Sequence, residues 1–402
     1  MPRKVTEFGF VPAQAAFNLG FSDMVAKRGF FLSALLGLAG VLAAIFYLRP
    51  AYFSANTPAP TVVDDWIGAL SGAESTGFER PAHDWALRLP DDHAAHPLAA
   101  AELWQMSAQL QGPDLAPMTV QFSVLRQGII PPADAANGNI WDMRDMYRAH
   151  VIASAQPGSP VRGEERFARG FAQLAGYDNE MQELRLDTWA LRFAQGTAAA
   201  PWQFRAAVDD VSITLELVAS KAPLPLAGAD APFQGYAFTR LEVSGTVATP
   251  EGEIAVTGLG WFEHVWGELP LPGAGPVISD RLLVQLDTGD DLVLITSRRR
   301  DGQGSPAVDA LLIDADGQAS QIGTQRAKLE FLRLWQGETG VWPVEWQITL
   351  DDTVTVTVAP VFAAQEQAFI TPVWSGLVRV DGMVNGQPVQ GMGLLQLAQG
   401  GT

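Results

Sequence analysis

One short stretch of the chain joins an acid and a histidine to two tryptophans. Glu263 and His264 lie between Trp261 and Trp266, inside a segment that runs from Gly258 to Gly267. Aromatic faces can line an apolar ligand pocket, and an adjacent carboxyl and imidazole can move a proton. The structural alternative is that the tryptophans belong to the core and the histidine is hydrogen-bonded. We expect Trp261, His264 and Trp266 to border a ligand pocket. Glu263 and His264 would be the catalytic pair only if the protein is an enzyme.

The remaining histidines offer weaker chemistry. The sequence has five histidines in all, and two of them, His93 and His96, follow a pair of aspartates. A catalytic zinc ion takes three protein ligands in a fixed geometry, and no third histidine lies close in sequence. His150 lies among several charged residues, which favours an ion-pair network. We therefore expect no metal and no other cofactor.

Composition excludes several classes of function. The formal net charge is −18, which disfavours a nucleic acid or an anionic lipid surface as the main partner. The chain has no cysteine, so disulfides and thiolate chemistry are excluded. It has neither a glycine-rich phosphate loop after a strand nor a Gly-x-Ser-x-Gly elbow.

Several segments resemble a known family. The stretch around His264 is similar to the Asp-His-x-Trp segment of the carotenoid 1,2-hydratase (hydroxyneurosporene synthase) family. The closer resemblance is to the lipocalin-like, AttH-like branch of that family, which is associated with ABC transporters. The matching pieces include Glu102-Leu-Trp104, Gln121–Arg126, Trp141–His150, Leu186–Arg192 and Arg240–Gly245.

The resemblance implies two lipocalin-like domains and a set of ligand-binding residues. That set comprises Glu102, Trp104, Arg126, His150, Trp261 and Trp266. Two positions depart from the family pattern, since Leu103 replaces a tryptophan and Glu263 replaces an aspartate.

The chemistry of alkene hydration argues against turnover. Adding water to an isolated double bond requires a strong acid and aromatic faces that stabilise the cation. In the similar hydratases, an acid and an aromatic residue follow on the next strand, whereas here that strand, Leu292–Ser297, has neither. Glu263 would have to donate the proton, so we expect binding of a lipid, isoprenoid or carotenoid.

Alternating strands are expected to position these residues. Val211, Ile213, Leu215 and Leu217 alternate with polar residues, and so do Val354, Val356 and Val358. Turn signals such as Asn385-Gly386 separate the runs. The pattern predicts a mainly β chain of antiparallel barrels or sandwiches.

A faint repeat supports two tandem domains. Trp202-Gln203 before Asp209-Asp210 reappears as Trp346-Gln347 before Asp351-Asp352. With the resemblance, this predicts lipocalin-like β-domains at 62–232 and 233–400, divided near the Pro/Gly/Ala-rich run 222–232.

The amino-terminal region predicts a membrane anchor. Residues 29–48 carry no charge and are long enough to span a bilayer, with Lys27-Arg28 before them. A signal peptide is the alternative, but its apolar region would be shorter. We expect a cytoplasmic arm at 1–28, a transmembrane helix at 29–48, a linker at 49–61 and the bulk of the chain in the periplasm, outside the inner membrane.

Three functions of different class remain open. One is a membrane-tethered binding protein for an apolar lipid or isoprenoid, with an ABC transporter as a partner. The second is an isoprenoid hydratase. The third is a non-catalytic accessory subunit of an integral-membrane complex.

Overall fold

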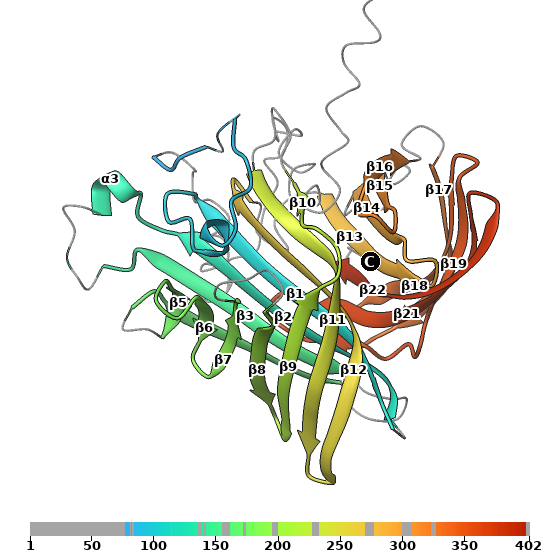
Figure 1. Cartoon of the computed structure of the whole chain (residues 1–402), viewed down its shortest axis with the longest axis horizontal. Coiled ribbons are helices and arrows are strands. Elements are labelled where there is room, and N and C mark those ends of the chain that lie inside the picture. The colour runs from blue at the N-terminus through green and yellow to red at the C-terminus, as the bar shows by residue number, and fades with distance from the viewer. Residues whose placement is uncertain are drawn as a thin grey trace, which may run out of the picture.

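Two antiparallel sheets make up the described part of the protein. The computed structural model describes residues 77–398 apart from positions 81, 83, 114, 136–138, 140, 141, 155–160, 172, 173, 195–199, 227–232, 270–276, 300–306 and 323–326. The first sheet has 12 strands and forms a nearly closed barrel, and the second has 10 and forms a half-barrel (Figure 1). The prediction of a mainly β chain built from antiparallel sheets is thereby confirmed.

The first sheet follows the order β4-β3-β2-β1-β12-β11-β9-β8-β7-β6-β5, with β10 paired to β11. Its strands are β1 (Ala101–Gly112), β2 (Leu115–Gly128), β3 (Asp145–Ser154), β4 (Arg162–Arg169), β5 (Ala175–Asp178), β6 (Glu183–Leu186), β7 (Trp189–Arg192), β8 (Trp202–Val208), β9 (Val211–Ala219), β10 (Leu224–Pro225), β11 (Phe233–Thr249) and β12 (Gly252–Gly267). Two short helical turns lie beside it, η1 (Asp91–His93) and α3 (Pro132–Ala135).

The second sheet follows the order β16-β15-β14-β13-β22-β21-β19-β18-β17, with β20 paired to β21. Its strands are β13 (Val277–Leu286), β14 (Asp291–Arg299), β15 (Ala307–Ile313), β16 (Ala319–Ile322), β17 (Ala327–Gln336), β18 (Val341–Leu350), β19 (Val354–Pro360), β20 (Glu366–Gln367), β21 (Val373–Val384) and β22 (Gln387–Ala398).

The strand order of the first sheet recurs in the second. In each sheet the first strand pairs with the last, as β1 does with β12 and β13 with β22. The segments of the sequence repeat occupy matching hairpins, β8–β9 and β18–β19, and Asp209 and Asp351 both adopt a φ of 49° at the turn. The two domains are therefore structural repeats.

The change of sheet falls later than the sequence analysis predicted. The division at residue 232 was wrong, because β11 and β12 complete the first sheet. Without them β1 would lack its neighbour β12, with which it pairs from Ala101↔Gly267 to Gln111↔Thr257. The Pro/Gly/Ala-rich run near 222–232 thus lies within the first domain, and the second sheet begins at Val277.

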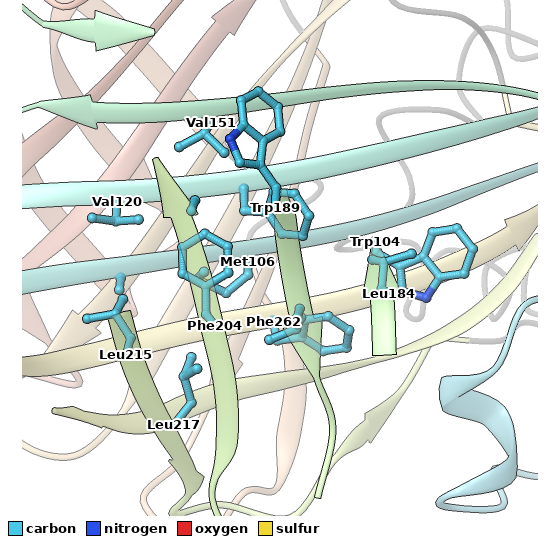
Figure 2. Packing of buried hydrophobic residues seen from close by; sticks show 14 of the residues in the cluster. Trp104, Met106, Val120, Val151, Leu184, Trp189, Phe204, Leu215, Leu217 and Phe262 are labelled. Atoms are coloured by element: carbon cyan, nitrogen blue, oxygen red, sulfur yellow. The ribbon is translucent and has the colours of Figure 1, made fainter. Parts of the chain in front are cut away.

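Period-two alternation builds the core of the barrel. On β9 the buried Val211, Ile213, Leu215 and Leu217 alternate with exposed polar residues, as predicted. They pack with inward side chains from the other strands, including Trp104, Phe204 and Phe262 (Figure 2). This apolar interior surrounds the candidate site.

A second apolar cluster joins the two sheets. Trp261 and Val265 of β12 pack with Leu283 of β13 and Val293 of β14. At one edge Asp291 accepts bonds from Lys221 Nζ at 2.7 Å and Arg240 Nη2 at 2.7 Å. One face of the first sheet therefore lies against the half-barrel.

The predicted arm, transmembrane helix and linker lie outside the described residues. Among the residues that are described, no helix combines the length and hydropathy needed to cross a bilayer.

Candidate functional site

Strand β12 divides the Gly258–Gly267 stretch between two environments. His264 and Trp266 point into the barrel, where Trp104 stacks on the His264 ring with centroids 4.5 Å apart. Trp261 and Glu263 point the other way, towards the second sheet. The structure therefore does not bring Trp261 to the same pocket as His264 and Trp266, because neighbouring residues of a strand face opposite sides.

A polar cluster lies inside the barrel around Glu102. The register places Glu102 opposite both Arg126 and Trp266. Its carboxylate accepts hydrogen bonds from Arg126 Nε at 3.0 Å and from the backbone N–H of His96 at 2.9 Å. The predicted residues Glu102, Trp104, Arg126, His264 and Trp266 thus meet in one buried group.

Two histidine rings approach the same carboxylate oxygen. His264 Nε2 lies 2.8 Å and His96 Nδ1 lies 2.9 Å from Glu102 Oε1. The His96 ring stacks on Trp266 with centroids 3.6 Å apart and planes 4° apart. The His96 side chain is 24% exposed, so it marks the solvent edge of the cluster.

Burial and contact set the protonation of these groups. Burial alone would raise the pKa of Glu102, but hydrogen bonds from His264 and His96 and the Arg126 charge hold it well below its usual range. Burial lowers the pKa of His264, although the Glu102 contact opposes this shift. Burial also lowers the pKa of His93, which contacts Tyr236, to about 3. Glu102 is therefore an ionised acceptor and a poor proton donor.

The outer face of the same sheet carries a different row of residues. Cross-strand partners place Glu263 opposite Gln105, Gln105 opposite Ser123, and Ser123 opposite His150. His150 thus belongs to this face, away from the Glu102 cluster. The row borders a cavity of about 190 Å³ between the two sheets.

The cavity is mainly apolar, with a few polar groups on its walls. Leu103 and Val265 of the first sheet and Val373 and Leu397 of the second provide apolar walls. Across the described part of the chain, neither the Ser123 hydroxyl nor the His150 ring has a hydrogen-bond partner. Burial and the Arg148 charge lower the pKa of His150 to about 3, so the ring is neutral.

Glu263 lies at the end of this row and forms an ion pair with Arg281. Both of its oxygens contact the guanidinium of Arg281 on β13, and Arg281 Nη1 also donates to Gln105 Oε1 at 3.0 Å. Burial raises the pKa of Glu263, and Arg281 opposes that shift. Among the described residues that line the apolar cavity, Glu263 is the acidic one.

A larger hollow of about 590 Å³ lies at another part of the junction between the sheets. Its lining includes Gln109, Arg240, Asp287 and Gln390 beside apolar residues such as Leu259 and Met392, so it is more polar than the smaller cavity. Arg240 is held there by Asp291. Its walls therefore suit an apolar ligand less well than those of the smaller cavity do.

Sequence reasoning did not assign His96 to the Glu102 cluster, and it missed three further contributors to these sites. Arg281 and Ser123 reach the cavity from strands distant in sequence, and Tyr236 reaches the barrel interior opposite His264. The available signal was alternation: residues at even spacing from His264 share its face, so Trp261 and Glu263 could have been separated from it.

The comparisons with known proteins agree with this fold. The family model described as AttH-like matches residues 80–400. A protein from Nitrosomonas europaea provisionally named AttH is similar in structure, with a TM-score of 0.67 and 23% identity, over 79% of this chain and 98% of that one. Kievitone hydratase from Nectria haematococca is also similar, with a TM-score of 0.57 and 12% identity, over 82% of this chain and 98% of that one. No curated protein matches the sequence. Since the family model covers most of the chain, this protein belongs to the AttH-like family.

Proposed function

We propose that this protein binds a largely apolar ligand, a lipid or an isoprenoid, in the cavity between its two sheets. The observation that carries the proposal is an apolar cavity of about 190 Å³, in whose walls Ser123 and His150 have no hydrogen-bond partner among the described residues. Ligand sites are typically apolar hollows with a few placed polar groups, and they occur preferentially at domain interfaces.

The polar groups define the ligand more closely. A neutral His150 and the Ser123 hydroxyl face each other across β2 and β3 and can exchange hydrogen bonds with one hydroxyl or carbonyl group. The apolar walls contribute through buried area, at about 25 cal/mol per Å² before entropy losses. A small molecule with an apolar body and one polar end fits this lining.

Hydration of such a ligand is the second candidate function. It is favoured by Glu263, a buried carboxyl of raised pKa in the lining of the apolar cavity. The similarity to kievitone hydratase shows a shared fold and says nothing more about this reaction. Against it, Arg281 holds both oxygens of Glu263, so a proton on this carboxyl would have to displace an ion pair. Binding is therefore the better-supported function.

The membrane attachment belongs to the same proposal. We propose that residues 29–48 anchor the protein in the inner membrane, with the described domains in the periplasm and an ABC transporter or another membrane complex as partner.

The orientation is tested with single cysteines placed at Ser22 and Ser320 of this cysteine-free chain and treated with an impermeant thiol reagent in spheroplasts. We expect labelling at 320 alone, and labelling at 22 alone would reverse the topology.

Ligand binding is tested by filling the cavity. The full chain is purified in mild detergent from its native membrane, and the bound lipids are identified by mass spectrometry. Ser123→Phe places a ring in the cavity, whereas Ser212→Phe makes the same change on the exposed face of β9. We expect bound ligand in the wild type and in Ser212→Phe, and its loss in Ser123→Phe. Equal ligand content in the two variants would reject the cavity as the site.

Turnover is tested separately with acyclic carotenoids and short isoprenoid alcohols as substrates. The binding function predicts no added water in the wild type. Hydration that disappears in Glu263→Gln, while Glu216→Gln on the exposed face of β9 retains it, would replace binding by catalysis.

A further inference from the structure

A neutral His264 ring cannot form both of the hydrogen bonds that its two nitrogens are placed to make. Its Nδ1 lies 3.0 Å from the carbonyl oxygen of Asp92, and its Nε2 lies 2.8 Å from Glu102 Oε1. A carbonyl and a carboxylate both only accept, whereas a neutral imidazole has one N–H to donate. With the proton on Nδ1, the Nε2 lone pair faces a carboxylate oxygen. A positive species is therefore required between His264 and Glu102.

The charges around this contact also favour a cation. Asp92, Glu102 and Asp145 contribute three carboxylates, and Arg126 contributes one guanidinium. Arg126 Nη1 lies 2.7 Å from Asp145, so its charge is shared between Asp145 and Glu102. Uncompensated charge is costly when it is buried, and Glu102 is fully buried. Two positive charges would neutralise the group.

The donor atoms suit a metal ion. His96, Glu102 and His264 present one ligand atom each, all within 4.8 Å of one another. Two imidazoles and one carboxylate form a donor set that zinc and related divalent ions accept. At zinc bond lengths of about 2.0–2.1 Å, tetrahedral donors lie about 3.3 Å apart, so the side chains need to separate by about half an ångström.

The surroundings of the three residues resemble those of metal-binding histidines. Such a histidine usually donates its other N–H to a carbonyl or carboxylate, as His264 Nδ1 does to Asp92. His96 is partly exposed and gives the ion access from solvent. We propose that His96, Glu102 and His264 bind one divalent transition-metal ion of the zinc class inside the first barrel. The site is separate from the cavity of the proposed function.

The test measures metal binding by the full chain, purified with a histidine-free tag, stripped with EDTA and dialysed. Co²⁺ is titrated while its visible absorption is followed, and Zn²⁺ affinity is measured by calorimetry. We expect one equivalent to bind, and His96→Ala to weaken binding at least tenfold. His150→Ala removes a histidine from the opposite face of the sheet and should leave the affinity unchanged. His96 is partly exposed, and a thermal melt verifies that its variant remains folded.

Three results would overturn the proposal. The first is that the wild type does not bind one equivalent of Co²⁺ or Zn²⁺. The second is that wild type and folded His96→Ala bind the metal ion with equal affinity. The third is a nitrogen NMR spectrum in which the His264 ring stays doubly protonated in zinc-treated protein, because a proton would then be the positive species. His264→Ala serves as a second ligand variant, with the same expected loss of affinity.

Discussion

The two faces of the first sheet use similar residues in opposite ways. On the inner face, Glu102 is surrounded by Arg126, His96 and His264 and is ionised. On the outer face, Glu263 contacts a single guanidinium, that of Arg281, and burial raises its pKa. Both carboxylates are buried. At equal burial, the number of donors around an acid therefore decides whether its pKa is lowered or raised.

The same contrast separates the tasks that we assign to the faces. The inner face is filled by aliphatic and aromatic side chains and holds a compact polar cluster. The outer face leaves a cavity, because the half-barrel covers it without filling it. One strand, β12, serves both faces through alternate residues.

The largest effect is expected from breaking the inner cluster. Glu102→Gln leaves Arg126, which is 1% exposed and cannot lose its proton, with Asp145 as its one carboxylate partner and the backbone carbonyls of His96 and Ala99 as neutral acceptors. Removing one partner of a buried pair costs about 3–5 kcal/mol of unfolding free energy. Thermal unfolding followed by tryptophan fluorescence measures the loss. The exposed Glu216→Gln on β9 is the control and should change stability by less than about 0.5 kcal/mol. Equal melting temperatures for the two variants would contradict the inner-face account.

A smaller loss is expected from breaking the outer pair. Arg281→Met leaves Glu263 without its guanidinium, but a carboxyl whose pKa is already raised can take up a proton. We expect a loss of about 2 kcal/mol, below that of Glu102→Gln. Adding Glu263→Gln to Arg281→Met should restore part of the stability, because the neutral side chain no longer needs a cation. A double variant less stable than Arg281→Met would show that the two sites are not coupled in this way.

A third effect concerns pH and His150. The pKa of this ring is about 3 in the fold, against 6.5 ordinarily, so the unfolded chain takes up a proton first as pH falls. The neutral ring therefore contributes unfolding free energy that is fully present above pH 6.5 and is lost as the pH falls from 6.5 to 3. The loss is less than about 1.4 kcal/mol per pH unit. Arg148 and Glu165 flank the ring in both wild type and variant. In His150→Phe the melting temperature should fall less between pH 7 and 4.5 than in wild type, and an equal fall would contradict a neutral, half-buried ring.

Local patterns in the sequence predicted much of the fold. The alternation of β9 and the repeated Trp-Gln and Asp-Asp segments identified strands and hairpins, because period and turn chemistry are local properties. The placement of β11 and β12 failed, since pairing between β12 and β1 joins residues far apart in the chain. A proline-containing connector inside a domain resembles one between domains.

The candidate site was predicted only in part. The resemblance identified Glu102, Arg126 and His264, which the fold brings together across 162 residues. It did not separate His150 from them, because the face of a side chain depends on register as well as on residue type. Nothing in the spacing of His93 and His96 indicated that His96 alone would join Glu102.

The most direct test of two separate faces compares one variant on each face for binding of geraniol, a short isoprenoid alcohol. Isothermal titration of the purified full chain gives the affinity of wild type, outer-face Ser123→Phe and inner-face His96→Ala. Our account predicts that Ser123→Phe abolishes binding of geraniol and that His96→Ala binds it as tightly as wild type. Loss of binding in His96→Ala with retention in Ser123→Phe would place the ligand inside the barrel and contradict the account.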